Sequence, residues 1–158
     1  MIMKKVISEI YCLILLIFSL LSRSRFVVRG NSMLPTFSDS DKFIINRFRY
    51  IFFNPKRGDI VCFKANWGIN NIYLKRIIGL PGESIELNGN EIYIDGVKYY
   101  ENYILEIHST IQSKHLYCKL ENSQYFVLGD NRETNFDSRR FGPIAKKDLI
   151  GPTFQICF

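Results

Sequence analysis

Hydrophobic and polar positions divide the chain into two unlike parts. From Val6 to Leu21 the residues are almost all aliphatic or aromatic, and Glu9 is the only charge. After residue 22, short apolar runs alternate with Gly, Pro, Asn and Asp turn signals, without long helical periodicity. The pattern predicts an N-terminal membrane anchor at 1–22, followed by a mainly β domain at 23–158.

The predicted membrane segment has two interpretations. A full span needs about 20 apolar residues, so this shorter stretch also fits a cleavable signal peptide. Residues 22–29 carry three arginines where a processing enzyme expects small neutral residues, which favours an uncleaved anchor. Basic residues lie on both flanks of the segment, so charge leaves its orientation open.

Branched and aromatic residues between turn signals predict the strands of the β domain. The predicted strands span 26–28, 42–46, 59–63, 72–78 and 125–128. Turns at Asn88-Gly89 and Asp95-Gly96 supply residues that accept positive φ, which predicts two successive hairpins. Residues 99–122 fit no sharp pattern and are expected to form a variable insertion.

Length and composition fit one globular domain. The 158 residues leave little room for a second core, and 9 Tyr and 13 Phe suit a strand-rich interior. Four cysteines show no Cys-x-x-Cys pairing and only two histidines are available, so neither a metal nor a cofactor is expected. Cys62, inside an apolar run, is expected to be a small buried side chain, whereas a bridge between Cys118 and Cys157 stays open.

The net charge of +6 is concentrated next to the predicted anchor. Residues 23–64 hold nine Lys or Arg and three Asp, whereas residues 65–158 hold ten Lys or Arg and eleven Asp or Glu. Between residues 47 and 57, basic side chains alternate with aromatic ones, a composition suited to anionic lipid headgroups. An ordinary solvated face is the alternative, and no nucleic-acid partner is expected.

A serine and a lysine supply the candidate chemistry. Ser32 lies in a loop between Gly30, which allows close backbone approach, and Pro35, which stiffens the loop. A serine hydroxyl needs a base, and neither histidine lies in a segment that resembles a triad. Lys75 lies in an apolar strand, where burial would lower its pKa and let a neutral amine take the proton of Ser32. In the alternative, Lys75 extends to solvent from a sheet edge while Arg76 pairs with a carboxylate.

Four segments resemble, in order, the bacterial type I signal peptidases of family S26. They are Gly-Asn-Ser-Met-Leu-Pro-Thr at 30–36, Gly-Asp-Ile-Val with a following Phe at 58–63, Tyr-Leu-Lys-Arg-Ile-Ile-Gly-Leu-Pro-Gly-Glu at 73–83, and Gly-Asp-Asn-Arg with Asp-Ser-Arg at 129–139. One such box is weak evidence, but four in family order are specific. The resemblance implies a signal-peptidase-like β-barrel or sheet catalytic domain with one N-terminal transmembrane helix.

The resemblance also implies a mechanism and a location. Ser32 matches the nucleophile of peptide hydrolysis through an acyl-enzyme, and Lys75 matches the general base. The Ser32 N–H is expected in the oxyanion hole, where the second donor is unassigned because Gly30 replaces a serine of some relatives. Met33 matches a residue that packs against the lysine. By the same likeness the chain is a single-pass cell-membrane protein with its catalytic domain on the extracytoplasmic side.

Supporting polar residues follow from the same likeness. The implied network comprises Arg76, Asp130, Arg132, Asp137 and Arg139, and Asp130 is expected to pair with Arg76.

The last box departs from the family pattern. Many relatives carry a serine after Asp-Asn that hydrogen-bonds the lysine, whereas this chain has Glu133-Thr134-Asn135. Three outcomes stay open: Asn135 orients the lysine, Thr134 supplies the hydroxyl, or the site is weakened.

The implied partners are signal-peptide-bearing preproteins, a lipid bilayer and the secretion machinery. An extended substrate with small residues before the cut is expected to bind by β-addition in a cleft lined by Val27 to Gly30 and part of the Gly129 strand. One alternative is a peptidase dedicated to a single conjugation or pilus substrate, and another is a non-catalytic, membrane-tethered preprotein-binding module. Self-cleaving SOS-type repressors also use serine and lysine, but they begin with a DNA-binding helical module where this chain has its apolar segment.

Overall fold

Two antiparallel sheets make up the protein in a computed structural model that describes residues 23–65, 72–104 and 115–155. The large sheet contains β1 (Arg23–Val27), β2 (Lys42–Asn46), β3 (Ile60–Lys64), β4 (Ile72–Gly79), β9 (Gln124–Leu128), β10 (Ile144–Ala145) and β11 (Leu149–Gln155). The small sheet contains β5 (Ser84–Asn88), β6 (Glu91–Ile94), β7 (Val97–Tyr99) and β8 (Leu116–Lys119). Short helical turns are α2 (Arg49–Phe52), α3 (Ser138–Phe141) and the 3-10 turn η1 (Lys146–Asp148).

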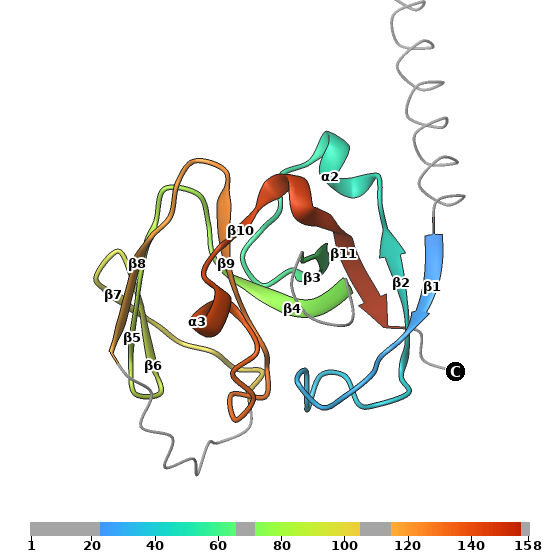
Figure 1. The fold of residues 1–158 in the computed structure, drawn as a ribbon, viewed down its shortest axis with the longest axis horizontal. Coiled ribbons are helices and arrows are strands. Elements are labelled where there is room, and N and C mark those ends of the chain that lie inside the picture. The colour runs from blue at the N-terminus through green and yellow to red at the C-terminus, as the bar shows by residue number, and fades with distance from the viewer. Residues whose placement is uncertain (1–22, 66–71, 105–114, 156–158) are drawn as a thin grey trace, which may run out of the picture.

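The large sheet has the strand order β1-β2-β11-β3-β4-β9-β10 (Figure 1). The predicted strand 42–46 is confirmed at both ends, and three others begin or end one residue away from their predicted bounds. The first strand begins earlier than predicted, at Arg23. In the described part of the chain no pairing joins β1 to β10, so the barrel form of the expected fold is corrected to an open sheet.

β11 holds the two halves of the large sheet together. It pairs with β2 through Thr153 and Ile45 and with β3 through Pro152 and Val61. β2 and β3 lie close together in sequence, yet β11, which follows every other strand along the chain, is inserted between them.

The small sheet is built from the two predicted hairpins, which are both confirmed. Asn88 pairs with Glu91 across the first turn, and Ile94 pairs with Val97 across the second. The turns hold Gly89 at φ 61° and Gly96 at φ 79°, which suits glycine.

The stretch 99–122 contains structure that the sequence pattern did not indicate. β8 lies within it and pairs with β5, with Cys118 opposite Ile85. Residues 116–119 of this stretch are therefore part of the small sheet.

Alternating side chains of β4 and β9 separate two apolar cores. Ile77 and Val127 join a cluster inside the large sheet, whereas Ile78, Phe126 and Leu128 join a cluster shared with the small sheet. A third cluster includes Met33, Phe37 and Cys62 and supports the loop after β1. These cores, with the pairing of β9, place the loop after β1 and the end of β9 at the middle of β4, where Leu74 and Arg76 lie.

None of the helices within the described ranges has the length and apolar character needed to cross a bilayer. The predicted anchor at 1–22 lies outside the described residues.

Candidate active site

The loop after β1 presents Ser32 at the protein surface by burying its neighbours. Met33 is 1% exposed and Phe37 is 2% exposed, both within the third apolar cluster. A turn closes the loop, since Phe37 N donates to Met33 O at 2.9 Å. Gly30, at φ 91°, starts the turn, and its N–H donates to Asp39 Oδ1 at 2.7 Å. Burial of the residues after Ser32, together with the Gly30 hydrogen bond before it, therefore fixes the backbone that carries the Ser32 hydroxyl.

A second loop, after β9, contacts the Ser32 loop directly. Asn131 N donates to Ser32 O at 3.1 Å, and Asn131 Nδ2 donates to Asn31 O at 3.2 Å. A Cβ on Gly129 would lie 2.5 Å from Ser32 O, which is too close for any other residue without a backbone shift. Glycine is thus required here by the close approach of the two loops.

Gly129→Ala is expected to lower kcat/KM by roughly 100-fold, because displacement of a reacting group by about 1 Å has that cost. The added methyl would press against the Ser32 carbonyl and move the hydroxyl away from its partner. Steady-state cleavage of a peptide substrate measures the loss. A suitable control is Gly96→Asn at a remote turn with nothing within 4 Å of a Cβ. Full activity of Gly129→Ala would show that the contact does not position the serine.

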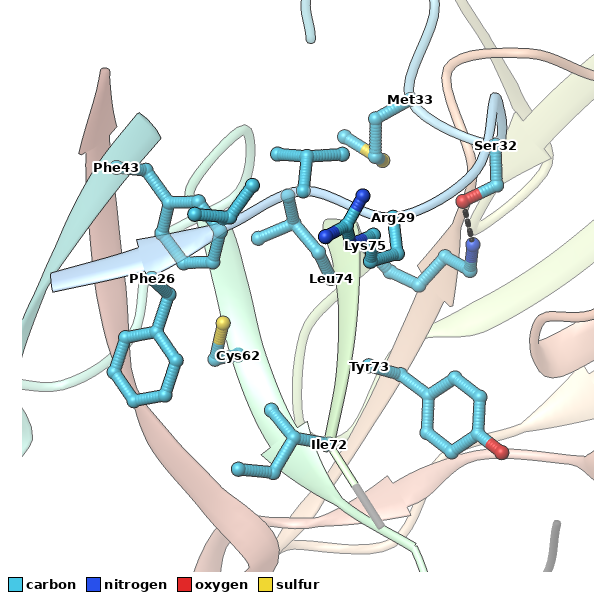
Figure 2. Close-up of a pocket in the computed structure, with 12 residues that line it drawn as sticks. Phe26, Arg29, Ser32, Met33, Phe43, Cys62, Ile72, Tyr73, Leu74 and Lys75 are labelled. Carbon is cyan, nitrogen blue, oxygen red and sulfur yellow. Dashed lines mark hydrogen bonds between the residues drawn. The ribbon is translucent and has the colours of Figure 1, made fainter. Parts of the chain in front are cut away.

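Lys75 is held on β4 with its side chain directed at Ser32 (Figure 2). The residue is 3% exposed, and its Nζ lies 2.6 Å from Ser32 Oγ. Burial lowers the pKa of the Lys75 ammonium from 10.5 to about 8, the Asp137 and Asp130 carboxylates oppose this shift, and Arg139 adds to it. A substantial neutral fraction near physiological pH follows, and a neutral amine accepts a proton.

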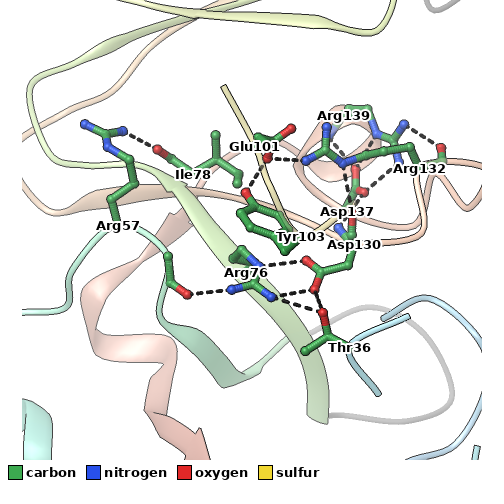
Figure 3. A network of polar contacts seen from close by, with 12 residues as sticks. Thr36, Arg57, Arg76, Ile78, Glu101, Tyr103, Asp130, Arg132, Asp137 and Arg139 are labelled. Atoms are coloured by element: carbon green, nitrogen blue, oxygen red, sulfur yellow. Dashed lines mark hydrogen bonds and ion pairs between the residues drawn. The ribbon is translucent and has the colours of Figure 1, made fainter. Parts of the chain in front are cut away.

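Next to Lys75 on the same strand, Arg76 forms the first part of a buried polar network (Figure 3). Its Nε and Nη2 donate to the two oxygens of Asp130 at 2.8 and 2.6 Å, which confirms the expected pairing. Nη1 donates to Gly58 O at 3.0 Å, and Thr36 Oγ1 bonds both the guanidinium and Asp130. The network therefore connects β4, the Ser32 loop and the loop after β9.

Asp137 organises the second part of the network. It is fully buried, accepts a hydrogen bond from Gly129 N at 3.1 Å, and pairs with Arg139 at 2.7 Å. Arg139 Nη1 donates to Arg132 O at 2.9 Å, and Arg132 Nε donates to Gly129 O at 3.0 Å. All five residues of the predicted network thus lie around Gly129 and Lys75.

Two members of the network were missed by sequence reasoning. Glu101 accepts hydrogen bonds from Arg132 and from Tyr103, and the Tyr103 ring lies 3.8 Å from the Arg76 guanidinium carbon (Figure 3). Both come from the stretch interpreted as an insertion. A cluster of tyrosines beside an acid was the only available signal, and its partners lie far away in sequence.

In the described part of the chain, no hydrogen bond joins either predicted lysine-orienting residue to Lys75. The Thr134 hydroxyl donates to Asn131 O at 2.9 Å, and Asn135 is exposed. Within the described ranges, Lys75 Nζ has no hydrogen-bond partner other than Ser32 Oγ. The Gly30 N–H is likewise engaged with Asp39 and not directed at a substrate.

A cleft of about 490 Å³ leads to the Ser32 hydroxyl (Figure 2). One wall is formed by Phe26 to Arg29 and the other by Ile72 to Lys75, with Met33 and Phe43 between them. Val27 lines the cleft as expected. The second wall, however, comes from β4 and not from the Gly129 strand. The loop after β9 instead contacts the backbone of Ser32. Cys62 also lines the cleft; it is a free thiol, 1% exposed, as predicted, while Cys157 lies outside the described residues.

A mainly β domain in which a buried lysine amine lies against a serine hydroxyl has the arrangement of the class of hydrolases that use a serine-lysine pair. The family model described as "Signal peptidase, peptidase S26" matches residues 3–158. The chain belongs to this signal peptidase family, peptidase S26, and is a serine endopeptidase.

Individual relatives agree with this assignment. Signal peptidase I V of Bacillus subtilis (strain 168) is 36% identical over 135 residues, covering 78% of this chain and 79% of that protein. Signal peptidase IB of Staphylococcus aureus (strain Mu50) is 35% identical over 141 residues, covering 80% and 73%. The crystal structure of a signal peptidase I from Enterococcus faecalis V583 has a TM-score of 0.56 at 30% identity, covering 63% of this chain and 97% of that chain. The expected mainly β, signal-peptidase-like fold is confirmed.

Proposed function

We propose that this protein removes signal peptides from secreted and membrane preproteins, with Ser32 as nucleophile and Lys75 as general base. The observation that carries the proposal is the 2.6 Å separation between the Ser32 hydroxyl oxygen and a 3% exposed lysine amine whose pKa is lowered to about 8. Membership of the signal peptidase family supports the substrate class.

The proposed reaction proceeds through an acyl-enzyme. The neutral Lys75 amine takes the proton of Ser32 Oγ as this oxygen attacks the scissile carbonyl carbon. The resulting ammonium gives the proton to the departing amine, and Lys75 then activates the water that hydrolyses the ester. The Ser32 N–H stabilises the oxyanion, a contribution of about 3 kcal/mol for one such donor.

The remaining site residues act as positioning residues in this proposal. Asp130 with Arg76, and Asp137 with Arg139 and Arg132, hold the loop after β9 against the Ser32 carbonyl. Met33 fills the core beneath the nucleophile. Because Thr134 and Asn135 bond elsewhere or face solvent, packing of the lysine stem rather than a further hydroxyl orients the amine.

An extended substrate is proposed to bind along β4. β3 covers one edge of β4 from Ile72 to Arg76, whereas the pairing with β9 begins only at Arg76, opposite Leu128. In the described part of the chain, β9 therefore does not cover Leu74 and Lys75 on the other edge of β4, and their backbone groups are proposed to receive an added strand. The apolar walls of the cleft suit short side chains before the cut.

Cleavage of a synthetic preprotein is the test of this function. Replacing alanine by phenylalanine at the first or third residue before the cut is expected to lower kcat/KM by roughly 100-fold or more, because the cleft has to accommodate the added volume. Ser32→Ala and Lys75→Ala provide the inactive controls. Equal cleavage of substrates with small and bulky residues would refute the proposed specificity, and product formation by Ser32→Ala would refute the nucleophile.

The same proposal includes an uncleaved anchor at residues 1–22 and a catalytic domain on the extracytoplasmic side of the cell membrane. The apolar run from Val6 to Leu21 and the arginines that follow it support the anchor. The secretion machinery is then the nearest source of preproteins. Breadth of cleavage across several preproteins separates this function from a peptidase dedicated to one conjugation or pilus substrate.

A further inference from the structure

α2 and its C-cap carry three large apolar side chains at the protein surface, none of which lines the cleft at Ser32. Ile51 is 66% exposed, Phe52 is 53% exposed and Phe53, which caps the helix, is 56% exposed. The helix has no buried residue. Adjacent apolar side chains of this size rarely face water without a binding role.

Cations lie beside this apolar group. Residues 46–55 contain Arg47 and Arg49 and no Asp or Glu. The Arg49 guanidinium carbon lies 4.7 Å from the centre of the Phe53 ring. A neighbouring groove of about 720 Å³ is lined by Arg47, Lys146 and Lys147, with Glu121 as its one carboxylate among the described lining residues. Apolar side chains flanked by cations are suited to a lipid bilayer, which has anionic headgroups at its surface and an apolar interior.

Tertiary contacts make these cations and apolar residues one continuous surface. Lys146 Nζ donates to Asn54 Oδ1 at 2.8 Å, which joins η1 to the segment after α2. Leu149, at the start of β11, lines the same groove as Tyr50 and Ile51. We call Arg47, Arg49, Ile51, Phe52, Phe53, Lys146 and Lys147 the α2 patch.

Strand register places the α2 patch at the end of the sheet where β1 begins. Arg23, the first residue of β1, pairs with Asn46, the last residue of β2. Asn46 Oδ1 accepts a hydrogen bond from Arg49 N at 3.1 Å, so α2 starts directly after this pair. Figure 1 shows α2 and the start of β1 at the same end of the molecule. Residues 1–22, proposed as the anchor, precede Arg23 in sequence.

We propose that the α2 patch is a second membrane contact, with Ile51, Phe52 and Phe53 in the interface and the cations on anionic headgroups. The inference rests on the proposed anchoring at residues 1–22, which would bring the patch to the bilayer. A tethered domain with a second contact is held in one orientation instead of rotating about its anchor. This contact fixes the height of the Ser32 cleft above the lipid.

Depth-dependent quenching of a tryptophan tests the contact. The full chain, with Trp67→Phe as background, is reconstituted in vesicles of phosphatidylcholine alone or mixed with phosphatidylglycerol. Phe52→Trp places the fluorophore in the patch, and Tyr117→Trp, a 63% exposed position on β8, is the matched control. Brominated lipid is expected to quench the Phe52→Trp variant in anionic vesicles at least several-fold more than the control.

Removal of charge should weaken the contact in a predictable way. The triple variant Arg47→Gln, Lys146→Gln, Lys147→Gln is expected to lower the ratio of docked to undocked protein by roughly 100-fold, since each cation near an anionic surface contributes about fivefold. High salt should act in the same direction. Equal quenching at the two tryptophan positions, or no effect of lipid charge, would overturn the proposal. Either result is expected if the α2 patch binds another protein instead of lipid.

Two further readouts separate this inference from the proposed function. Sedimentation of the full chain with vesicles at high salt reports the anchor alone. Cleavage of a soluble peptide in detergent reports the chemistry, and the triple variant is expected to cleave it at the parental rate. Loss of patch quenching with both of these intact refutes the α2 contact only.

Discussion

Lys75→Ala is expected to lower kcat/KM by roughly 10³-fold or more, because general base catalysis contributes about 10²–10⁴-fold and Lys75 Nζ is the basic group that the described residues place on the Ser32 hydroxyl. For the parent enzyme, kcat/KM should rise with pH and level off above a midpoint near 8. The sign follows from the chemistry: the pKa of Lys75 is lowered to about 8, and only the deprotonated amine accepts the proton. Initial rates across this pH range, with a peptide substrate that does not titrate there, measure the midpoint.

Lys75→Arg is the sharpest control for this role. Arginine retains the positive charge and hydrogen-bond donors but keeps its proton throughout the accessible pH range. It should therefore be as inactive as Lys75→Ala at every pH. Lys75→Met, which fills a similar volume without a polar group, should unfold no more readily than the parent, because a buried amine does not favour the fold. Substantial activity in Lys75→Arg, or a flat profile in the parent, would contradict the base assignment.

Asp130→Ala is expected to destabilise the protein by about 3–5 kcal/mol, the usual cost of leaving one partner of a buried ion pair alone. The Asp130 side chain is 1% exposed and that of Arg76 is 11% exposed. With the carboxylate gone, the guanidinium keeps Gly58 O and the Thr36 hydroxyl but loses its counter-charge. Denaturant unfolding of the full chain in detergent, followed by circular dichroism, measures the loss.

A double variant distinguishes a buried ion pair, whose loss of one partner lowers the free energy of unfolding, from a contact that does not affect stability. Arg76→Met combined with Asp130→Leu removes both charges and should recover much of the stability lost by Asp130→Ala alone. Glu91→Ala, which breaks the solvated pair with Lys98, should leave the unfolding midpoint unchanged. If Asp130→Ala behaved like Glu91→Ala, the network would not stabilise the site loops in the way inferred here.

The strands that the sequence predicts are those with local signals. β2 and the two hairpins follow from β-branched runs and from turns such as Asn88-Gly89. β11 escapes prediction because Gly151 and Pro152 interrupt its apolar run. The glycine is needed since a Cβ at residue 151 would lie 2.3 Å from Asn46 O, a contact that only the assembled sheet creates. β8 has only four residues, and its partner strand β5 lies about 30 residues earlier.

The residues of the site also divide into those with a local sequence signal and those without one. Ser32, Lys75 and the Asp130–Arg76 pair are anticipated because their motifs keep family order, and Lys75 also lies in an apolar run. Glu101 and Tyr103 have no motif, and their roles arise from contacts with Arg132 and Arg76 across the two sheets. The second wall of the cleft exists because β4 extends beyond the part that pairs with β9. This pairing register is set by tertiary contacts. Long-range packing, which a single sequence does not encode in local patterns, determines these features.

The place of β11 between β2 and β3 also sets when the enzyme becomes capable of cutting. Ser32 belongs to the β1–β2 hairpin, whereas Lys75 belongs to β4 beyond β3, and β11 joins these two halves. A ribosome synthesises β11 after all the other described strands, so a nascent chain lacks the strand that pairs with both halves of the sheet. We therefore expect the Ser32 and Lys75 side chains to reach their final geometry only after translation has passed residue 155, a delay that would protect unfinished chains and their neighbours from proteolysis.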